Sequence, residues 1–155
     1  MICCFTGHRY FSWGENAAQK TDLLISLKKS IDIALSKGAT YFICGNAIGV
    51  DTWAAQIILN KKEQNPEIFL EIAVPFQGHN AGVAACQNVQ QKADFVHVVS
   101  NAKSIRQAFY ERNRYMVDIS NMIIAVYEES RHNSGTLKTL RYAENQGLEI
   151  IGISV

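Results

Sequence analysis

The sequence predicts an α/β fold, with a doubly wound and mostly parallel sheet of about six strands and helices on both of its faces. Short apolar runs that are rich in Ile, Val, Phe and Tyr alternate with amphipathic stretches along the whole chain. Several of these runs are apolar at successive positions, which is typical of parallel strands that are buried on both faces. The expected strands are residues 1–5, 40–44, 68–74, 94–99, 121–127 and 148–155.

The amphipathic stretches predict a helix between each pair of consecutive strands. Ser104 stands three residues before Gln107, the spacing of a capping box, and is expected to start the fourth helix. The predicted inner face of the first helix is Leu24, Leu27, Ile31, Ala34 and Leu35. That of the second helix is Val50, Trp53, Ala54, Ile57 and Ile58. The first helix is expected to stop at Gly38, and the second to start after Gly49. A third helix is expected around 82–92, and a last helix from about Thr136 to Gln146, closed by Gly147.

Length and composition limit the classes of protein that the chain can belong to. Its 155 residues are expected to form one domain, residues 1–155, and the 48% apolar content excludes a disordered chain. No apolar run approaches the ~20 residues of a membrane span, and the first residues lack the features of a secretory signal. The formal charge of +1 gives no overall attraction to nucleic acid or to a membrane. We therefore expect a cytoplasmic protein whose partners are neither membranes nor nucleic acids.

The four cysteines lack the spacing of a metal site. Cys3 and Cys4 are adjacent, so in a strand they point to opposite faces, and no Cys-x-x-Cys pattern occurs. We expect unpaired structural thiols in a reducing compartment, and neither a metal nor a cofactor.

The loops that follow the strands are where a site is expected, because doubly wound sheets bind ligands at the carboxyl ends of their strands. Glycine and small polar residues concentrate in these loops. They are residues 6–14, 45–51, 75–80 and 128–136.

Two of these loops lead through glycines into helix N-termini, where backbone N–H groups and the helix dipole favour an anion such as phosphate. Gly45 and Gly49 would let the backbone approach a bound group. Gly135 would do the same at the second loop, where the Thr136 hydroxyl can cap the helix or donate to an oxyanion. The alternative is that the glycines only form tight turns and that Thr136 only caps.

The first loop begins with Thr6, Gly7, His8 and Arg9, which would bring two donor or cationic side chains to the same edge. The alternative is that the His-Arg pair is simply solvated. Asp51 is either a first-turn acid that complements the helix dipole or an acceptor for ribose hydroxyls. By contrast, the remaining loop histidines, His79 and His132, are expected to have no special task.

Arg112 lies within the apolar stripe of its helix, which is Ile105, Ala108, Phe109, Met116 and Ile119. A buried guanidinium needs a partner, because burying an unpaired charge costs several kcal/mol. A ligand phosphate, or a carboxylate such as Asp51 or Asp118, could be that partner. A purely structural Arg–Asp pair is the alternative.

Five segments in this order resemble the YpsA-like family of the SLOG superfamily, which is named for the Smf/DprA and LOG proteins. They are CFTGHR (4–9), GNAIGVDTWAA (45–55), VPF (74–76), RNRYMVDISNMIIAVY (112–127) and SGTLKTLRYA (134–143). The resemblance spans nearly the whole chain. It implies a Rossmann-like SLOG domain with a site for a nucleotide-derived ligand.

The LOG enzymes of the superfamily are phosphoribohydrolases, and their motif is only partly present here. Arg112 matches their helical arginine, and Gly135-Thr136 matches the G-T pair of their P-G-G-x-G-T-x-x-E motif. The glutamate of that motif falls at Thr139, so the catalytic pair is broken. Asp51 is the one nearby acid in a matching motif that could replace it, which leaves Arg112 and Asp51 as candidate catalytic residues. The candidate ligand-binding residues are Thr6, Gly7, His8, Arg9, Gly45, Asn46, Gly49, Asp51, Pro75, Arg112, Asn113, Ser134, Gly135 and Thr136.

The first expectation for function is a binding module or sensor for a small nucleotide-type ligand. One alternative is an N-glycosidase or other nucleotide hydrolase with a relocated acid. Another is a partner- or single-strand-binding protein like the DprA relatives, for which the aromatic run YFSW (10–13) could stack bases, although the low net charge argues against it. The same run could instead be a lid over the site or a peripheral packing cluster. The resemblance leaves homo-oligomers possible, because relatives in the superfamily are often dimers.

Overall fold

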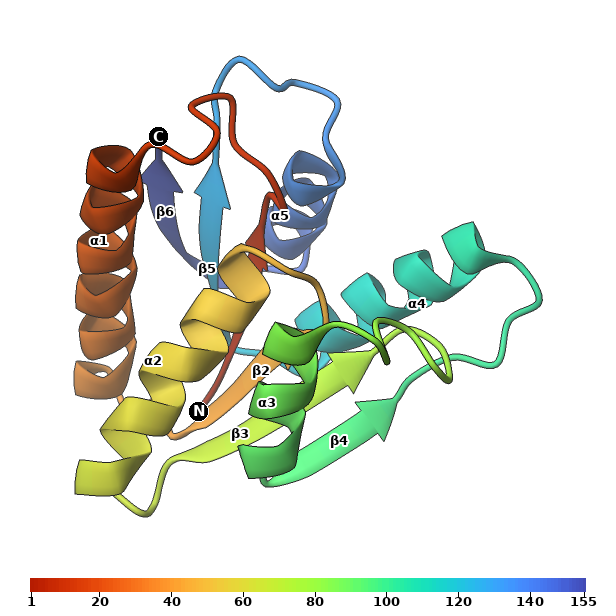
Figure 1. Ribbon diagram of the computed structural model, residues 1–155, viewed down its shortest axis with the longest axis horizontal. Coiled ribbons are helices and arrows are strands. Elements are labelled where there is room, and N and C mark those ends of the chain that lie inside the picture. The colour runs from red at the N-terminus through yellow and green to blue at the C-terminus, as the bar shows by residue number, and fades with distance from the viewer.

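The computed structural model describes residues 1–155 and shows a six-stranded sheet in which all neighbouring strands are parallel (Figure 1). The strands are β1 (Ile2–Gly7), β2 (Tyr41–Gly45), β3 (Phe69–Val74), β4 (Phe95–Val98), β5 (Met122–Tyr127) and β6 (Glu149–Ser154). Their order is β4-β3-β2-β1-β5-β6, so the chain starts in the middle and winds outward first on one side and then on the other. The predicted Rossmann-like α/β fold is confirmed. The strand order reverses between β1 and β5, which is where such sheets bind ligands.

Five helices cover the sheet, and they lie close to their predicted positions. They are α1 (Ala17–Ser36), α2 (Val50–Gln64), α3 (Ala84–Lys92), α4 (Ile105–Asp118) and α5 (Gly135–Asn145). The first three pack on one face, around a core of 24 buried residues. The last two pack on the other face, around a smaller core of 7 buried residues (Figure 1). The thinner core leaves more room for polar groups beneath α4 and α5.

The inner face of α1 differs from the predicted one at its two ends. Leu23 is buried there, while the predicted Leu24 and Leu35 are only partly buried. Leu23 lies four residues before Leu27, so these two stack on the same side of the helix. The start of α1 is fixed by Asn16, whose side chain accepts a hydrogen bond from the Gln19 N–H at 3.1 Å.

The apolar stripe of α4 is narrower than predicted. Ile105 is 64% exposed and Ile119 is 38% exposed, so neither belongs to the core. The buried row is instead Ala108, Arg112 and Met116, with Val117 beside it. These three follow each other at four-residue spacing and form one straight row on the helix. The first turn of α4 lies beyond the ends of the strands, which leaves Ile105 without a sheet to cover (Figure 1).

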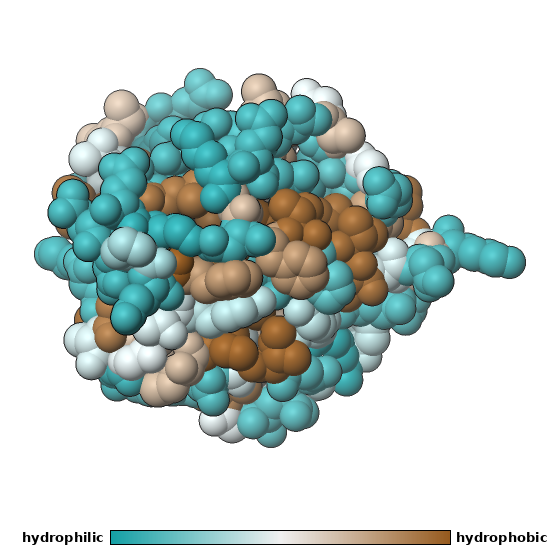
Figure 2. Space-filling model, turned by 90° about the horizontal axis from the view of Figure 1, so that it is seen from below, coloured by the Kyte–Doolittle hydropathy of each residue, from teal (hydrophilic) through white to brown (hydrophobic).

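The edge strand β4 is the least buried strand of the sheet. Phe95, Val96 and Val98 are each 39–44% exposed, because β4 has a neighbour on one side only. The side of the molecule seen in Figure 2 is mostly hydrophilic, with an apolar area near its centre. No helix is both long and apolar enough to cross a lipid bilayer. The four cysteines are free and buried.

Candidate functional site

A cavity of about 480 Å³ lies at the carboxyl ends of the central strands, where the strand order reverses. Its volume is within the ~300–1,000 Å³ that is usual for small-molecule sites. Four separate segments form its walls: the end of β1 with the loop after it, the end of β2 with the start of α2, one side of α4, and the loop after β5 with the first turns of α5. Residues that are far apart in the sequence therefore converge at one edge of the sheet.

Eleven of the fourteen candidate ligand-binding residues line this cavity. They are Thr6, Gly7, His8, Arg9, Gly45, Asp51, Arg112, Asn113, Ser134, Gly135 and Thr136. The three that do not line it are Asn46, Gly49 and Pro75.

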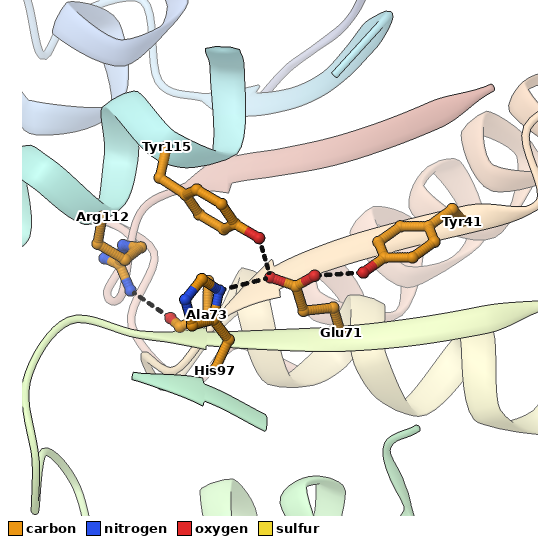
Figure 3. A network of polar contacts seen from close by, with 6 residues as sticks. All are labelled: Tyr41, Glu71, Ala73, His97, Arg112 and Tyr115. Atoms are coloured by element: carbon orange, nitrogen blue, oxygen red, sulfur yellow. Dashed lines mark hydrogen bonds and ion pairs between the residues drawn. The ribbon is translucent and has the colours of Figure 1, made fainter. Parts of the chain in front are cut away.

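Arg112 is the most buried cation of the cavity, with only 5% of its surface exposed. Its Nε donates to Asn113 Oδ1 at 2.8 Å. Its Nη1 donates to the Ala73 carbonyl at 3.4 Å, as Figure 3 shows. Burial lowers the pKa of Arg112, while the charge of Asp51 opposes that shift. Asp118, the other predicted partner, instead accepts a hydrogen bond from Tyr142. Of the two carboxylates proposed from the sequence, only Asp51 is therefore near the guanidinium.

Asp51 and Arg112 meet at Gly45 without forming a direct ion pair. A Cβ atom at position 45 would lie 2.5 Å from Asp51 Oδ2 and 2.8 Å from Arg112 Nη1. The Asp51 carboxylate also accepts the Ala47 N–H at 3.3 Å. Burial raises the pKa of Asp51, and the nearby Arg112 is the strongest opposing influence. Position 45 must therefore be glycine for the acid and the guanidinium to face the same space.

Near Arg112, the buried Glu71 anchors α4 to the sheet (Figure 3). Glu71 on β3 accepts hydrogen bonds from the hydroxyls of Tyr41 and Tyr115, the latter at 2.6 Å, and lies 3.3 Å from His97 Nδ1. Burial, reinforced by the hydrogen bonds to Glu71, raises the pKa of both tyrosines. The network fixes the part of α4 that carries Arg112, because Tyr115 follows Arg112 by less than one helical turn.

The space beside Gly49 is filled by the backbone of the loop after β1, and Gly49 does not line the cavity. It has a φ of +84°, and a Cβ there would lie 2.7 Å from the Arg9 carbonyl oxygen and 2.8 Å from that of His8. Gly7 is equally tight, since a Cβ there would lie 2.5 Å from the Val50 side chain. The two glycines let the loop after β1 pack on the start of α2. The group that approaches Gly49 in the structure is the backbone of the neighbouring loop, and the expectation that Gly49 lets the backbone approach a ligand stays a prediction.

Asn46 is likewise a structural residue. It is 1% exposed, donates to the His79 carbonyl at 2.9 Å and accepts from Gln90 at 2.7 Å. Pro75 is also buried, and its carbonyl accepts the Ser100 N–H. The Asn46 contacts join the loop after β2 to the loop after β3 and to α3, and the Pro75 contact joins the loops after β3 and β4.

His79 is more constrained than a plain loop residue. It is 9% exposed and its ring meets those of Phe76 and Phe109 edge-on. Burial, together with the charges of Arg112 and Arg9, lowers the pKa of His79 to about 4. His79 therefore has a constrained environment, while the expectation that it has no special task stays a prediction.

His8 lines the cavity as a neutral group and not as a cation. It is 3% exposed, and its Nε2 accepts the Glu128 N–H at 3.0 Å. Burial lowers the pKa of His8, and the charge of Arg131 lowers it further. The ring thus ties the loop after β1 to the end of β5, and Arg9 alone supplies the positive charge of the His-Arg pair.

Sequence reasoning missed several residues that line the cavity. They are Phe5, Tyr10, Ala47, Phe109, Met116, Arg131 and Thr139. Arg131 could have been found, since it stands in the loop after β5 together with the predicted Ser134. Its guanidinium donates to the Tyr10 carbonyl and so ties two walls of the cavity together. Phe109 lies beside two arginines, with the Arg9 and Arg112 guanidinium carbons 5.1 and 5.5 Å from its ring centre.

The aromatic run after Arg9 divides into two parts. Phe11 is buried and stacks on Trp13 at 4.9 Å and on Trp53 at 6.2 Å between ring centres. Tyr10 is 70% exposed and is the one aromatic of the run that lines the cavity. The packing-cluster interpretation therefore describes Phe11 and Trp13.

Ser134, and not Thr136, caps α5. The Ser134 hydroxyl accepts the Leu137 N–H at 3.2 Å, while Thr136 is buried against the cavity. The N–H groups of Gly135 and Thr136 belong to the first turn and have no acceptor within the helix. They are available to an anion in the cavity.

Comparison with known proteins shows where this chain belongs. The YpsA family model, described as the YspA SLOG family, matches residues 3–154. The chain belongs to the YpsA family of SLOG proteins. The resemblance inferred from the five sequence segments is thereby confirmed.

Among bacterial relatives, the chain is similar to proteins of the UPF0398 group. It is 23% identical over 136 residues to one from Halalkalibacterium halodurans, covering 84% of this chain and 72% of the relative. It is 22% identical over 138 residues to one from Staphylococcus haemolyticus, covering 83% and 74%. A third, from Bacillus pumilus, is 22% identical over 155 residues, covering 93% and 82%. These names give no activity, so function has to be argued from the cavity.

Within this YpsA-family chain, Thr139 occupies the position where the LOG motif has its glutamate. Thr139 lines the cavity, and its hydroxyl donates to the Gly135 carbonyl at 3.0 Å. No carboxylate is present at that point, and Asp51 is the one acidic side chain of the cavity wall.

Proposed function

We propose that the protein binds a small nucleotide-type ligand in this cavity and acts as a binding module or sensor. The observation that carries the proposal is the convergence of Arg9, Arg112 and Arg131 from three separate segments on one cavity. Asp51 is the one acid opposite them, so the cavity has an excess of positive charge although the whole chain carries only +1. An anion compensates this excess better than any neutral molecule does.

Phosphate is the anion that best fits the donors. Guanidinium groups bind phosphate through paired hydrogen bonds, and the first turn of α5 adds backbone N–H groups and the positive end of the helix dipole. Thr6, Ser134 and Thr136 add hydroxyls to the same walls. Asp51 is suited to accept hydrogen bonds from the hydroxyls of a ribose. Phosphate donors and a sugar acceptor together favour a nucleotide over inorganic phosphate.

The sharpest test uses Arg9→Ala, because Arg9 lines the cavity but lies on its exposed side. Removing it leaves no buried charge unpaired. Losing one charge-assisted contact costs about 1.5–3 kcal/mol, which weakens binding by about 10- to 100-fold. Calorimetric titration of the four ribonucleoside 5′-monophosphates should show this loss for each one that binds the unchanged protein.

The matched control is Arg141→Ala. Arg141 is an exposed arginine of α5 that lines neither this cavity nor the neighbouring one, so its loss should leave the affinity unchanged. Equal binding by wild type and Arg9→Ala would refute the proposal that the arginines hold the ligand.

A second candidate function is hydrolysis of an N-glycosidic bond, and the environment of Asp51 favours it. A carboxyl group whose pKa is raised by burial, beside an arginine and within a cavity, resembles a general acid or base. Incubation of the protein with nucleoside monophosphates should then release free base, and Asp51→Asn should lower the rate by about 100-fold or more. Release that is unchanged in Asp51→Asn would exclude Asp51 as the acid.

A further inference from the structure

A second cleft, of about 490 Å³, lies between α4 and α5 beside the first cavity. Arg106 and Arg114 from α4 and Lys138 from α5 line it, and no acidic residue does. None of these three cations forms an ion pair within the chain. The cleft is therefore a concentration of positive charge without a carboxylate in an ion pair with it.

One of these charges is held in place by aromatic rings. The guanidinium carbon of Arg114 lies 4.0 Å from the ring centre of Tyr142 and 4.7 Å from that of Tyr110. Tyr142 is itself fixed, because its hydroxyl donates to Asp118. A cation that is fixed before binding loses less conformational entropy when an anion arrives.

The cleft and the first cavity are adjacent and share part of their walls. Asn113, Gly135 and Thr139 line both of them. Gly135 is the boundary residue with the least bulk, and a Cβ at its position would meet no atom within 4 Å. A single ligand could therefore extend across the first turn of α5 from one space into the other.

We propose that the α4–α5 cleft holds a second phosphate-bearing part of the same ligand, so that the ligand is an extended nucleotide with two separated anionic parts. This inference rests on the function proposed for the first cavity. Arg9, Arg112 and Arg131 hold one phosphate group, while Arg106, Arg114 and Lys138 hold the other.

Paired probes test this inference. Each ribonucleoside 5′-monophosphate is titrated beside extended probes with the same 5′ base, its 5′-phosphorylated dinucleotides, in which a nucleoside separates the two phosphate groups. At least one extended probe should bind about 10- to 100-fold more tightly than its mononucleotide, as expected for one or two added charge-assisted contacts.

The double variant Arg106→Ala/Lys138→Ala should abolish this advantage and leave the affinity for the mononucleotide unchanged. Both residues are exposed and lie outside the first cavity, so their removal should not disturb the fold. Arg141→Ala is again the control and should keep the advantage.

Two results would overturn the inference alone: mononucleotides bind but no extended probe binds more tightly, or the advantage survives in the double variant. A failure of every probe to bind would overturn the proposed function as well, so the two failures are distinguishable.

Discussion

Replacing Gly45 by alanine perturbs the candidate site at its most crowded point. The added Cβ would lie 2.5 Å from Asp51 Oδ2 and 2.8 Å from Arg112 Nη1, both too close for van der Waals contact. Neither group can move freely, because Asp51 accepts the Ala47 N–H and Arg112 donates to Asn113 and to the Ala73 carbonyl. One of these hydrogen-bonded groups must therefore be displaced.

The magnitude follows from two opposing contributions. Overpacking a well-filled site costs about 1–3 kcal/mol, whereas exchanging glycine for alanine stiffens the unfolded chain and returns about 0.4–1 kcal/mol. The net loss of about 1–2 kcal/mol lowers the Tm by about 2–8 °C for a chain of this length. The affinity for the nucleotide probes should fall as well, because Arg112 no longer holds its position.

Thermal melting and calorimetric titration of Gly45→Ala measure both effects. Gly82→Ala is the matched control, since a Cβ there meets no atom within 4 Å and its φ is not in the left-handed region. The control should melt at or slightly above the wild-type Tm. If Gly45→Ala has the same Tm as the control and binds the nucleotide probes as tightly as wild type, the proposed closeness of Asp51 and Arg112 at Gly45 is refuted.

Further predictions concern the residues around the site. Since burial lowers the pKa of His79 to about 4 while an unfolded histidine titrates near 6.5, the unfolded state binds more protons in this window. The free energy of unfolding should therefore fall by about 1–2 kcal/mol as the pH drops from 6.5 to 4, after allowance for solvent around the ring. Urea titrations should show a weaker pH dependence in His79→Asn, and His132→Asn, at an exposed position, should behave like wild type. Tyr115→Phe removes a hydrogen bond to the buried Glu71 and should cost about 1.5–3 kcal/mol in urea unfolding, whereas the exposed Tyr110→Phe should cost less than about 0.5 kcal/mol. Ser134→Ala removes the cap of α5 and should lower the unfolding free energy by about 1 kcal/mol; an unchanged value would show that the cap contributes nothing.

Much of the fold could be predicted because its signals are local. Apolar runs fixed each strand to within about two residues of its observed position, and Ser104 marked the start of α4 through its spacing to Gln107. Because doubly wound sheets bind ligands at the carboxyl ends of their strands, the sequence then predicted a site in the loops that form most of the cavity wall. These inferences need only neighbouring residues and the regular geometry of a parallel sheet.

The failures concern contacts between residues far apart in the chain. The sequence indicates His8 as a donor or a cation, but its Nε2 accepts the Glu128 N–H, and these residues are 120 positions apart. Asn46 resembled a ligand-binding residue, but it is held by Gln90, 44 positions away. Spacing within a single motif contains no information about such partners. The α4–α5 cleft was missed for the same reason, since its charges come from two helices that meet only in the folded chain.

Amide and arginine side-chain NMR during titration with the ribonucleoside 5′-monophosphates tests the central claim most directly. If the cavity binds the phosphate, saturable shifts should appear in the amides of Gly135 and Thr136 and in the Nε–H of Arg112, while the amide of Gly82 stays unchanged. Saturable shifts that map to another face, or no shifts at these three groups with any of the nucleotides, would contradict the claim that the converging arginines form a nucleotide site.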